Sequence, residues 1–278
     1  MLMQKRLYKK VLILGIIALF VGASVIPSTI GTFEKMTTFS HTNYPGYIQD
    51  LIDNANPGDT IYIPSGTYYE NIIINKSISL IGEDKDTTII DGRGNGTVIY
   101  ICAKDVNVSC FTIQNGNPAI DIKNSESAVV TGNNVRSWDT GIKVEGSDFC
   151  LCENNNISKN IYGIFLTRAH NNIITGNIIS NNRRGIYLRD ARFNFILKNN
   201  FIDNDRDAFY SSEILDFTLR TNRWWQNYWN GSRLLPKPIF GEIYWITFEG
   251  IPPKHPVEHH LPWFPKIDWH PALKPYDI

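Results

Sequence analysis

The stretch GIFLTRAHNNIITGNIISNNRRGIYLRD, from Gly163 to Asp190, decides the fold, because its opening residues recur before it ends. The pair Gly163-Ile164 returns as Gly185-Ile186, at a step of 22 in the numbering. Searching outward at this step gives further equivalent pairs. They are Thr97-Val98, Ala119-Ile120 and Gly141-Ile142 before it, and Ala208-Phe209 after it at a step of 23. A fixed period of this kind is typical of a repeat architecture.

Apolar residues alternate within each copy. In Gly163-Ile-Phe-Leu166, for example, Ile164 and Leu166 point the same way, which is strand periodicity. Helical repeats need about 33 residues or more and a 3.6-residue period, and neither fits. A unit of short strands instead winds one turn of a solenoid, whose coils pair strand on strand about 4.8 Å apart. The sequence therefore predicts an all-β, right-handed parallel β-helix of about 22 residues per coil.

Asparagine occupies one turn position in successive copies. Burying an amide costs free energy unless it is hydrogen-bonded, and stacked amides can bond to one another and to turn backbone groups. We therefore expect a structural ladder. Its predicted members are Asn133, Asn155, Asn177, Asn199 and Asn222.

The N-terminal segment, residues 1–30, predicts export. Basic residues between Lys5 and Lys10 precede an apolar run from Val11 to Ile26, as in a secretory signal peptide. The segment is either such a peptide or an N-terminal membrane anchor. In both cases the rest of the chain lies outside the cytoplasm, secreted or attached to the cell membrane. Five N-x-[S/T] sequons suit export, although an Asn-rich repeat also generates them by chance.

Both ends of the repeat are expected to carry caps. Tyr47–Ala55 has apolar residues at helical spacing and is followed by Pro57-Gly58, which ends a helix. We assign residues 43–224 to the β-helix with its N-terminal helical cap. Residues 225–278 are rich in Trp and Pro, lack the repeat, and are expected to form a C-terminal capping tail.

The chain resembles known β-helix families. Gly58-Asp-Thr-Ile61, Gly66-Thr-Tyr68 and Ser79-Leu-Ile-Gly82 are similar to the opening of pectate-lyase-like proteins. The segments NIITGNII (172–179) and GIYL (185–188) resemble the carbohydrate-binding and sugar-hydrolysis repeats of NosD-type periplasmic proteins, and similar exported proteins are common in archaea. The resemblance implies the fold and, as one alternative, a role in copper delivery. It does not fix an activity, because many chemistries share this scaffold.

No catalytic motif is evident. Asp121 and Lys143 have opposite charges at stacked outward positions, which is ordinary surface pairing, and no paired carboxylates suggest glycoside hydrolysis. Arg168, His170, Arg189 and Asp190 form the strongest polar cluster, and a salt bridge between Arg168 and Asp190 is its simplest interpretation. We assign no catalytic residue or cofactor, while a lyase or hydrolase with an unrecognised site remains an alternative. A net charge of zero gives no indication of nucleic-acid binding.

Metal-binding signals are also weak. Copper(I) prefers thioether and thiolate ligands, but the methionines lie outside the repeats, and Cys150 and Cys152 fit the apolar core. A disulfide between Cys102 and Cys110 is left open. His255, His259 and His260 are the candidates for a copper site, although nearby prolines make their geometry unpredictable. We assign no metal ligand.

The functional prediction is glycan binding at the cell surface. Phe165, Tyr187 and Tyr210 are expected to form an outward aromatic strip on successive coils, with Arg189 and Asp190 at its edge to bond sugar hydroxyls. The alternative is that the Trp-rich tail covers this strip and the protein is purely structural.

Overall fold

The structure is a computed structural model that describes residues 46–213, 222–230, 237–249, 255–268 and 270–278. It does not describe the side chains of residues 213, 241–249 and 255–267. The predicted signal or anchor segment, residues 1–30, lies outside the described residues. No helix within the described part is long and apolar enough to cross a bilayer.

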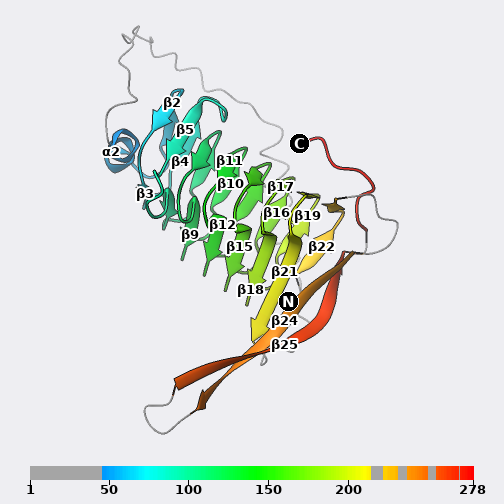
Figure 1. The fold of residues 1–278 in the computed structure, drawn as a ribbon. Helices are drawn as coiled ribbons and strands as arrows, with labels where there is room; N and C mark the ends of the chain where they lie inside the picture. The colour runs from blue at the N-terminus through cyan, green and yellow to red at the C-terminus, as the bar shows by residue number, and fades with distance from the viewer. Residues whose placement is uncertain (1–45, 214–221, 231–236, 250–254, 269) are drawn as a thin grey trace, which may run out of the picture. The chain divides into compact units, whose positions relative to one another are not determined.

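The chain winds into coils of three short strands, and each strand of a coil joins a different sheet (Figure 1). The first sheet contains β1 (Thr60–Ile63), β4 (Ser79–Gly82), β7 (Asn107–Ser109), β10 (Val129–Thr131), β13 (Leu151–Glu153), β16 (Ile173–Thr175), β19 (Phe195–Leu197) and β22 (Arg223–Trp225). The second contains β2 (Gly66–Tyr68), β5 (Thr88–Asp91), β8 (Thr112–Gln114), β11 (Asn134–Arg136), β14 (Asn156–Ser158), β17 (Ile178–Ser180), β20 (Asn200–Ile202) and β23 (Tyr228–Trp229). The third contains β3 (Ile72–Ile74), β6 (Ile99–Ile101), β9 (Ile120–Lys123), β12 (Thr140–Glu145), β15 (Tyr162–Thr167), β18 (Arg184–Arg189), β21 (Arg206–Glu213), β24 (Lys237–Glu249) and β25 (His255–Asp268).

Strands of successive coils pair in parallel, so the prediction of an all-β, right-handed parallel β-helix is confirmed. The predicted coil length is also confirmed, since Val130 pairs with Cys152, Cys152 with Ile174, and Ile174 with Ile196, always at a step of 22. Among the described strands, only β25 pairs antiparallel: β24 runs parallel to β21, and β25 returns antiparallel to β24.

The core is a set of stacked columns of β-branched residues. In the third sheet, Ile120, Ile142, Ile164 and Ile186 lie one above another without exposed surface. The glycine before each of the last three isoleucines is also required. A Cβ on Gly163 would lie 2.6 Å from the carbonyl oxygen of Gly185, closer than any side chain tolerates. This contact explains the Gly-Ile pair that marks the repeat.

The predicted helix is present as α2 (Tyr47–Asn54), packed against the first coil with Ile48 and Ile52 fully buried. The Glu70 carboxylate accepts hydrogen bonds from the backbone N–H groups of Ile48 and Gln49 at the start of the helix. The Lys76 ammonium donates to three carbonyl oxygens at its end. Both charges match the polarity of the helix dipole.

Within the described residues, asparagine forms three ladders, at three corners of the coils, and not one. Within a ladder, the amide oxygen accepts from the previous coil and Nδ2 donates to the next amide oxygen and to a backbone carbonyl, as Asn155 does with Asn177 and Val130. The first ladder contains Asn133, Asn155, Asn177, Asn199 and Asn227; the second contains Asn172, Asn194 and Asn222; the third contains Asn160, Asn182 and Asn204.

The prediction for Asn222 was therefore wrong, because this residue accepts from Asn194 in the second ladder. The last step of the first ladder runs from Asn199 to Asn227, a step of 28. This coil has additional residues after β21. Adding 22 or 23 to the number of Asn199 therefore identifies a residue at a different corner of the coil.

Candidate functional site

The outward face of the third sheet carries the candidate site. Along one column the side chains change from charged to aromatic. From β9 to β21 the paired residues are Asp121, Lys143, Phe165, Tyr187 and Phe209. Tyr162, at the start of β15, adds a fourth ring beside Phe165 and Tyr187. We call Tyr162, Phe165, Tyr187 and Phe209 the aromatic column.

The rings of the aromatic column stack on one another. The centroids of Phe165 and Tyr187 are 4.9 Å apart with an interplanar angle of 9°, and those of Tyr187 and Phe209 are 5.7 Å apart. Because neighbouring rings face each other, their edges rather than their faces point away from the sheet. Ring edges carry partial positive charge. This arrangement does not support the predicted packing of sugar C–H groups on the ring faces.

Tyr210 is not part of this face, contrary to prediction. It pairs with Leu188 and is buried in the core with 5% of its surface exposed, and burial raises its pKa to about 12. Ile186 pairs with Ala208, so the step into the last coil is 22 rather than 23, and Phe209 takes the outward position. A shift of one residue moves a side chain to the other side of a strand.

Two arginines add positive charge beside the rings. The Arg184 guanidinium lies 5.3, 5.2 and 5.4 Å from the ring centroids of Tyr162, Tyr187 and Phe209. Its Nη1 also donates to the Tyr162 hydroxyl. Arg206, which is exposed, lies 4.7 Å from the Phe209 centroid.

The structure places Arg189 on the same face, since it follows Tyr187 by two residues in β18 and pairs with Thr167 and Ser211. Asp190 lies in the turn after β18, where its backbone N–H donates to the Ser211 carbonyl. Arg168 makes an ion pair with Glu145 at 3.4 Å, in the preceding coil. His170 accepts from the backbone N–H of Arg192 through Nδ1.

A charged cluster lies at the other end of the column. The Lys143 ammonium is 2.6 Å from Glu145 and 3.8 Å from Asp121, and Lys123 is 3.4 Å from Glu145. Burial raises the pKa of Asp121, and no described group donates to its Oδ1. The hydrogen bond from Lys143 lowers the pKa of Glu145. The two carboxylates share one ammonium and do not flank an open substrate position.

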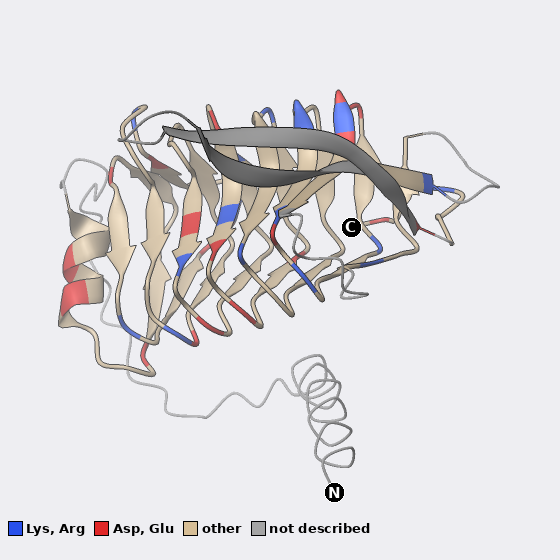
Figure 2. Ribbon diagram, turned by 90° about the horizontal axis from the view of Figure 1, so that it is seen from below, with Lys and Arg blue, Asp and Glu red and all other residues tan. Residues whose placement is uncertain are grey.

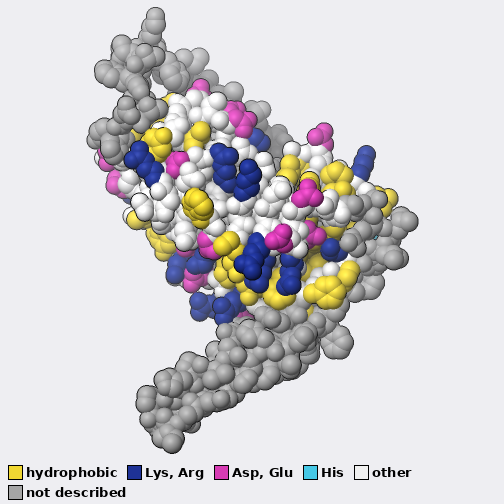
Figure 3. All heavy atoms as spheres, viewed as in Figure 1, with side chains coloured by type: hydrophobic (Ala, Val, Ile, Leu, Met, Phe, Trp, Pro, Cys, Tyr) yellow, Lys and Arg dark blue, Asp and Glu magenta, His cyan; other side chains and the backbone are white. Residues whose placement is uncertain are grey.

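Charges of both signs recur along the stacked coils (Figure 2). On the face shown in Figure 3, basic and acidic side chains are likewise interspersed among uncharged ones. The positive charge beside the aromatic column is therefore a local feature, as the net charge of zero suggests.

Potential metal ligands are dispersed within the described residues, where no three His, Cys, Asp or Glu side chains come together. The four cysteines are free thiols, including Cys102 and Cys110. Burial raises the pKa of Cys150 to about 11 and that of Cys152 further, which disfavours the thiolates that bind copper(I). His255, His259 and His260 belong to β25, and their side chains lie outside the described residues.

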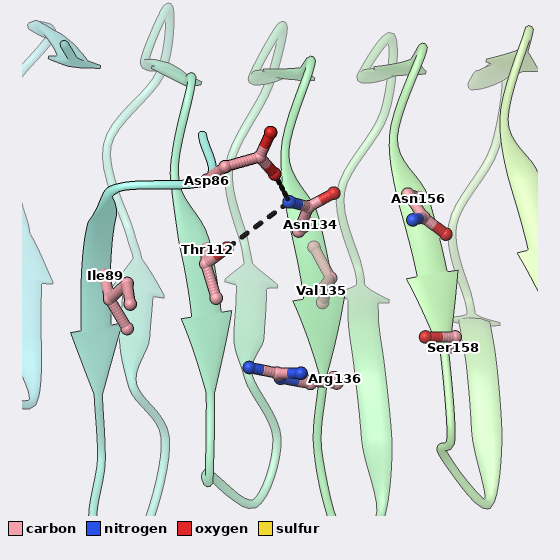
Figure 4. A pocket seen from close by; sticks show the side chains of 8 residues that line it. All are labelled: Asp86, Ile89, Thr112, Asn134, Val135, Arg136, Asn156 and Ser158. Atoms are coloured by element: carbon pink, nitrogen blue, oxygen red, sulfur yellow. Dashed lines mark hydrogen bonds between the residues drawn. The ribbon is translucent and has the colours of Figure 1, made fainter. Parts of the chain in front are cut away.

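A polar pocket of about 320 Å³, not anticipated from the sequence, lies on the outward side of the second sheet (Figure 4). It is lined by Asp86, Ile89, Thr112, Asn134, Val135, Arg136, Asn156 and Ser158. Four adjacent strands and the turn before β5 contribute these residues. The repeat predicts which of them face outward, but Asp86 belongs to an irregular early turn that no column could place.

The comparisons with known proteins agree with this architecture. The family model described as periplasmic copper-binding protein (NosD) matches residues 52–237, which is most of the chain. This chain belongs to the NosD family. No curated protein matches it.

Three solved structures similar to this NosD-family chain are distant from it in sequence. An alginate lyase from Paenibacillus sp. str. FPU-7 is 14% identical over 66% of this chain and 82% of its own, with a TM-score of 0.50. Gene product 12 of bacteriophage phi29 is 15% identical over 69% of this chain and 31% of its own, with a TM-score of 0.53. A pectin methylesterase from Yersinia enterocolitica is 12% identical over 77% and 85%, with a TM-score of 0.47. The first two similarities show the parallel β-helix fold alone.

Proposed function

We propose that this NosD-family β-helix is an extracytoplasmic protein that binds an anionic polysaccharide along the outward face of its third sheet. The observation that carries the proposal is the aromatic column with Arg184 and Arg206 beside it. The basic N-terminal segment followed by an apolar run, and the family's periplasmic description, support the location.

The chemistry of the face favours carboxylate-bearing sugars. The outward ring edges are weakly positive, and the guanidinium groups provide formal charge and planar donors that match carboxylates. Arg189, on the same face two residues after Tyr187, adds a third guanidinium. The column runs along the stack of coils, so a linear polymer can contact several coils at once. Such repeated weak contacts raise overall avidity.

Binding to immobilised polygalacturonate and alginate, with dextran as the neutral comparison, tests this proposal. We expect the two polyuronates to bind, binding to weaken as salt rises, and Arg206→Ala to reduce the affinity about tenfold. Arg223→Ala is the matched control, because Arg223 is also exposed and lies over a phenylalanine, Phe195, but on the first sheet. Equal affinity of both variants and the native protein, or no affinity for either polyuronate, would reject the site.

Copper binding is the second candidate, favoured by the description of the matching family. Because the described residues supply no cluster of ligands, the test concerns the three histidines of β25. The full chain would be titrated with copper(I) and copper(II), and the bound metal counted. Stoichiometric binding that is lost in the triple variant His255→Ala, His259→Ala and His260→Ala supports this function, and unchanged binding places the ligands elsewhere.

A further inference from the structure

The pocket on the second sheet shares no residue with the aromatic column or the charged cluster. Its volume of about 320 Å³ is at the lower end of the range for small-molecule sites, which suits one sugar residue better than a long polymer segment. Ile89 provides apolar surface, and the remaining lining side chains are polar, apart from Val135, whose side chain is 1% exposed and packs in the core. Sugar sites require this combination, because a pyranose has both C–H and hydroxyl groups.

Hydrogen bonds hold two opposite charges at the margins of the pocket. Asp86 Oδ1 accepts from Asn134 Nδ2 at 2.8 Å, and the Asn134 amide also approaches the Thr112 hydroxyl. At the other margin, the Arg136 guanidinium donates to Gln114 Oε1 through Nε and Nη2. Figure 4 shows Asp86 and Arg136 toward opposite ends of the strands that carry the pocket. The pocket therefore offers acceptors and donors that are positioned before a ligand arrives.

Trp138 lies just beyond the pocket. It follows Arg136 by two residues, so their Cα atoms are at most about 7 Å apart. The Trp138 side chain is 70% exposed, and no described ring stacks on it. This differs from the aromatic column, whose rings cover one another's faces. An exposed indole face is suitable for packing against the C–H face of a sugar.

We propose that this pocket binds one neutral hexose residue of a glycan, while Trp138 packs against the next residue of the same chain. Because Asp86 and Arg136 have opposite charges, the pocket offers no net attraction to a uronate or to an amino sugar, whereas uncharged hydroxyl groups can bond to both side chains. This site is separate from the proposed polyuronate face and differs from it in ligand class.

The test is a calorimetric titration of the full chain with maltohexaose, cellohexaose and mannohexaose. The protein is produced in a host without N-glycosylation, since Asn156-Ile157-Ser158 in the pocket is a sequon. We expect one of the three to bind, and Arg136→Ala and Trp138→Ala each to weaken binding about tenfold. Trp225→Ala is the control, because Trp225 is an exposed tryptophan on the first sheet.

Two results would overturn the proposal: no binding of any of these oligosaccharides at millimolar concentration, or binding that both pocket variants retain while circular dichroism shows them folded. Arg206→Ala should leave binding of the neutral sugar unchanged. Conversely, Arg136→Ala should leave polyuronate binding unchanged. Failure at one face is therefore distinguishable from failure at the other.

Discussion

Asn227 donates both its backbone N–H and its Nδ2 to a single atom, Oδ2 of Asp268, each at 3.0 Å. In earlier coils the Oδ1 of the next asparagine takes this place. An asparagine at the end of the ladder would need an acceptor for its own amide hydrogens. An ionised carboxylate accepts without donating, so Asp268 completes the ladder and leaves no donor unpaired.

Replacing Asp268 should markedly lower the free energy of unfolding. Asp268 is fully buried and also accepts from Trp229 Nε1, so Asp268→Ala leaves three buried N–H groups without an acceptor, although Asn227 Nδ2 keeps its bond to the Ile196 carbonyl. We expect the free energy of unfolding in urea to fall by about 3 kcal/mol or more. Asp268→Asn keeps one acceptor oxygen and should lose clearly less. If both variants lose the same free energy of unfolding, the acceptor oxygen of Asp268 is not the source of the stabilisation.

Replacing an asparagine in the interior of the ladder should destabilise the folded protein by a similar amount. Asn177 donates to Asn199 Oδ1 and to the carbonyls of Cys152 and Thr175, and it accepts from Asn155. We expect Asn177→Ala to lower the free energy of unfolding by about 3 kcal/mol. The control is Asn156→Ala. Asn156 is an exposed asparagine of the same repeat, so this change should alter the free energy of unfolding by less than about 0.5 kcal/mol. Similar values for both would argue against the ladder as a source of stability.

The regular part of the repeat made the fold and the first asparagine ladder predictable. Where a coil is 22 residues long, the residue that pairs with a given position in the next coil is found by adding 22 to its number, as for Phe165 and Tyr187. Counting fails where coils differ in length. Ile99 pairs with Ile120 at a step of 21, and Asn199 bonds to Asn227 at a step of 28. Such local deletions and insertions do not change the hydrophobic pattern strongly enough to be seen in one sequence.

The candidate sites were only partly predictable. The sequence predicted Phe165 and Tyr187 as members of the aromatic column. It did not predict Arg184, because the position of its guanidinium beside three rings depends on the conformation of a long side chain. The second-sheet pocket depends on Asp86, which bonds to a residue 48 positions later. Irregular turns are not constrained by the period, so sequence alone could not bring these groups together.

The register of the last coil can be tested with two neighbouring residues. Tyr210 packs in the core, whereas Phe209, although also buried, lies on the other side of the strand against Tyr187 and Arg206. We expect Tyr210→Ala to cost about 3–5 kcal/mol in urea unfolding, as for other buried aromatic residues. Phe209→Ala should cost less, about 2 kcal/mol, because its ring, although only 9% exposed, packs against another ring and guanidinium groups and not in the core. The reverse order would indicate the step of 23 that the sequence suggested.

The charged cluster should produce opposite pH effects in two variants. Burial raises the pKa of Asp121 in the folded protein, so the folded state binds this proton more tightly than the unfolded state. The contribution of Asp121 to stability therefore falls as pH rises through the interval between its unfolded and folded pKa values. Asp121→Asn should consequently be more stable than the native protein at neutral pH, and the difference should vanish in acid.

The pKa of Glu145 shifts in the opposite direction to that of Asp121, so its contribution to stability changes with pH in the opposite way. The hydrogen bond from Lys143 lowers its folded pKa, so its contribution is complete at neutral pH and is lost as pH falls through the folded pKa. Glu145→Gln should therefore be less stable than the native protein at neutral pH and should approach it in acid. Urea unfolding of the two variants from acid to neutral pH measures both trends. If Asp121→Asn instead lowers stability at neutral pH, the ion pair of Asp121 with Lys143 at 3.8 Å outweighs the cost of burying the carboxylate.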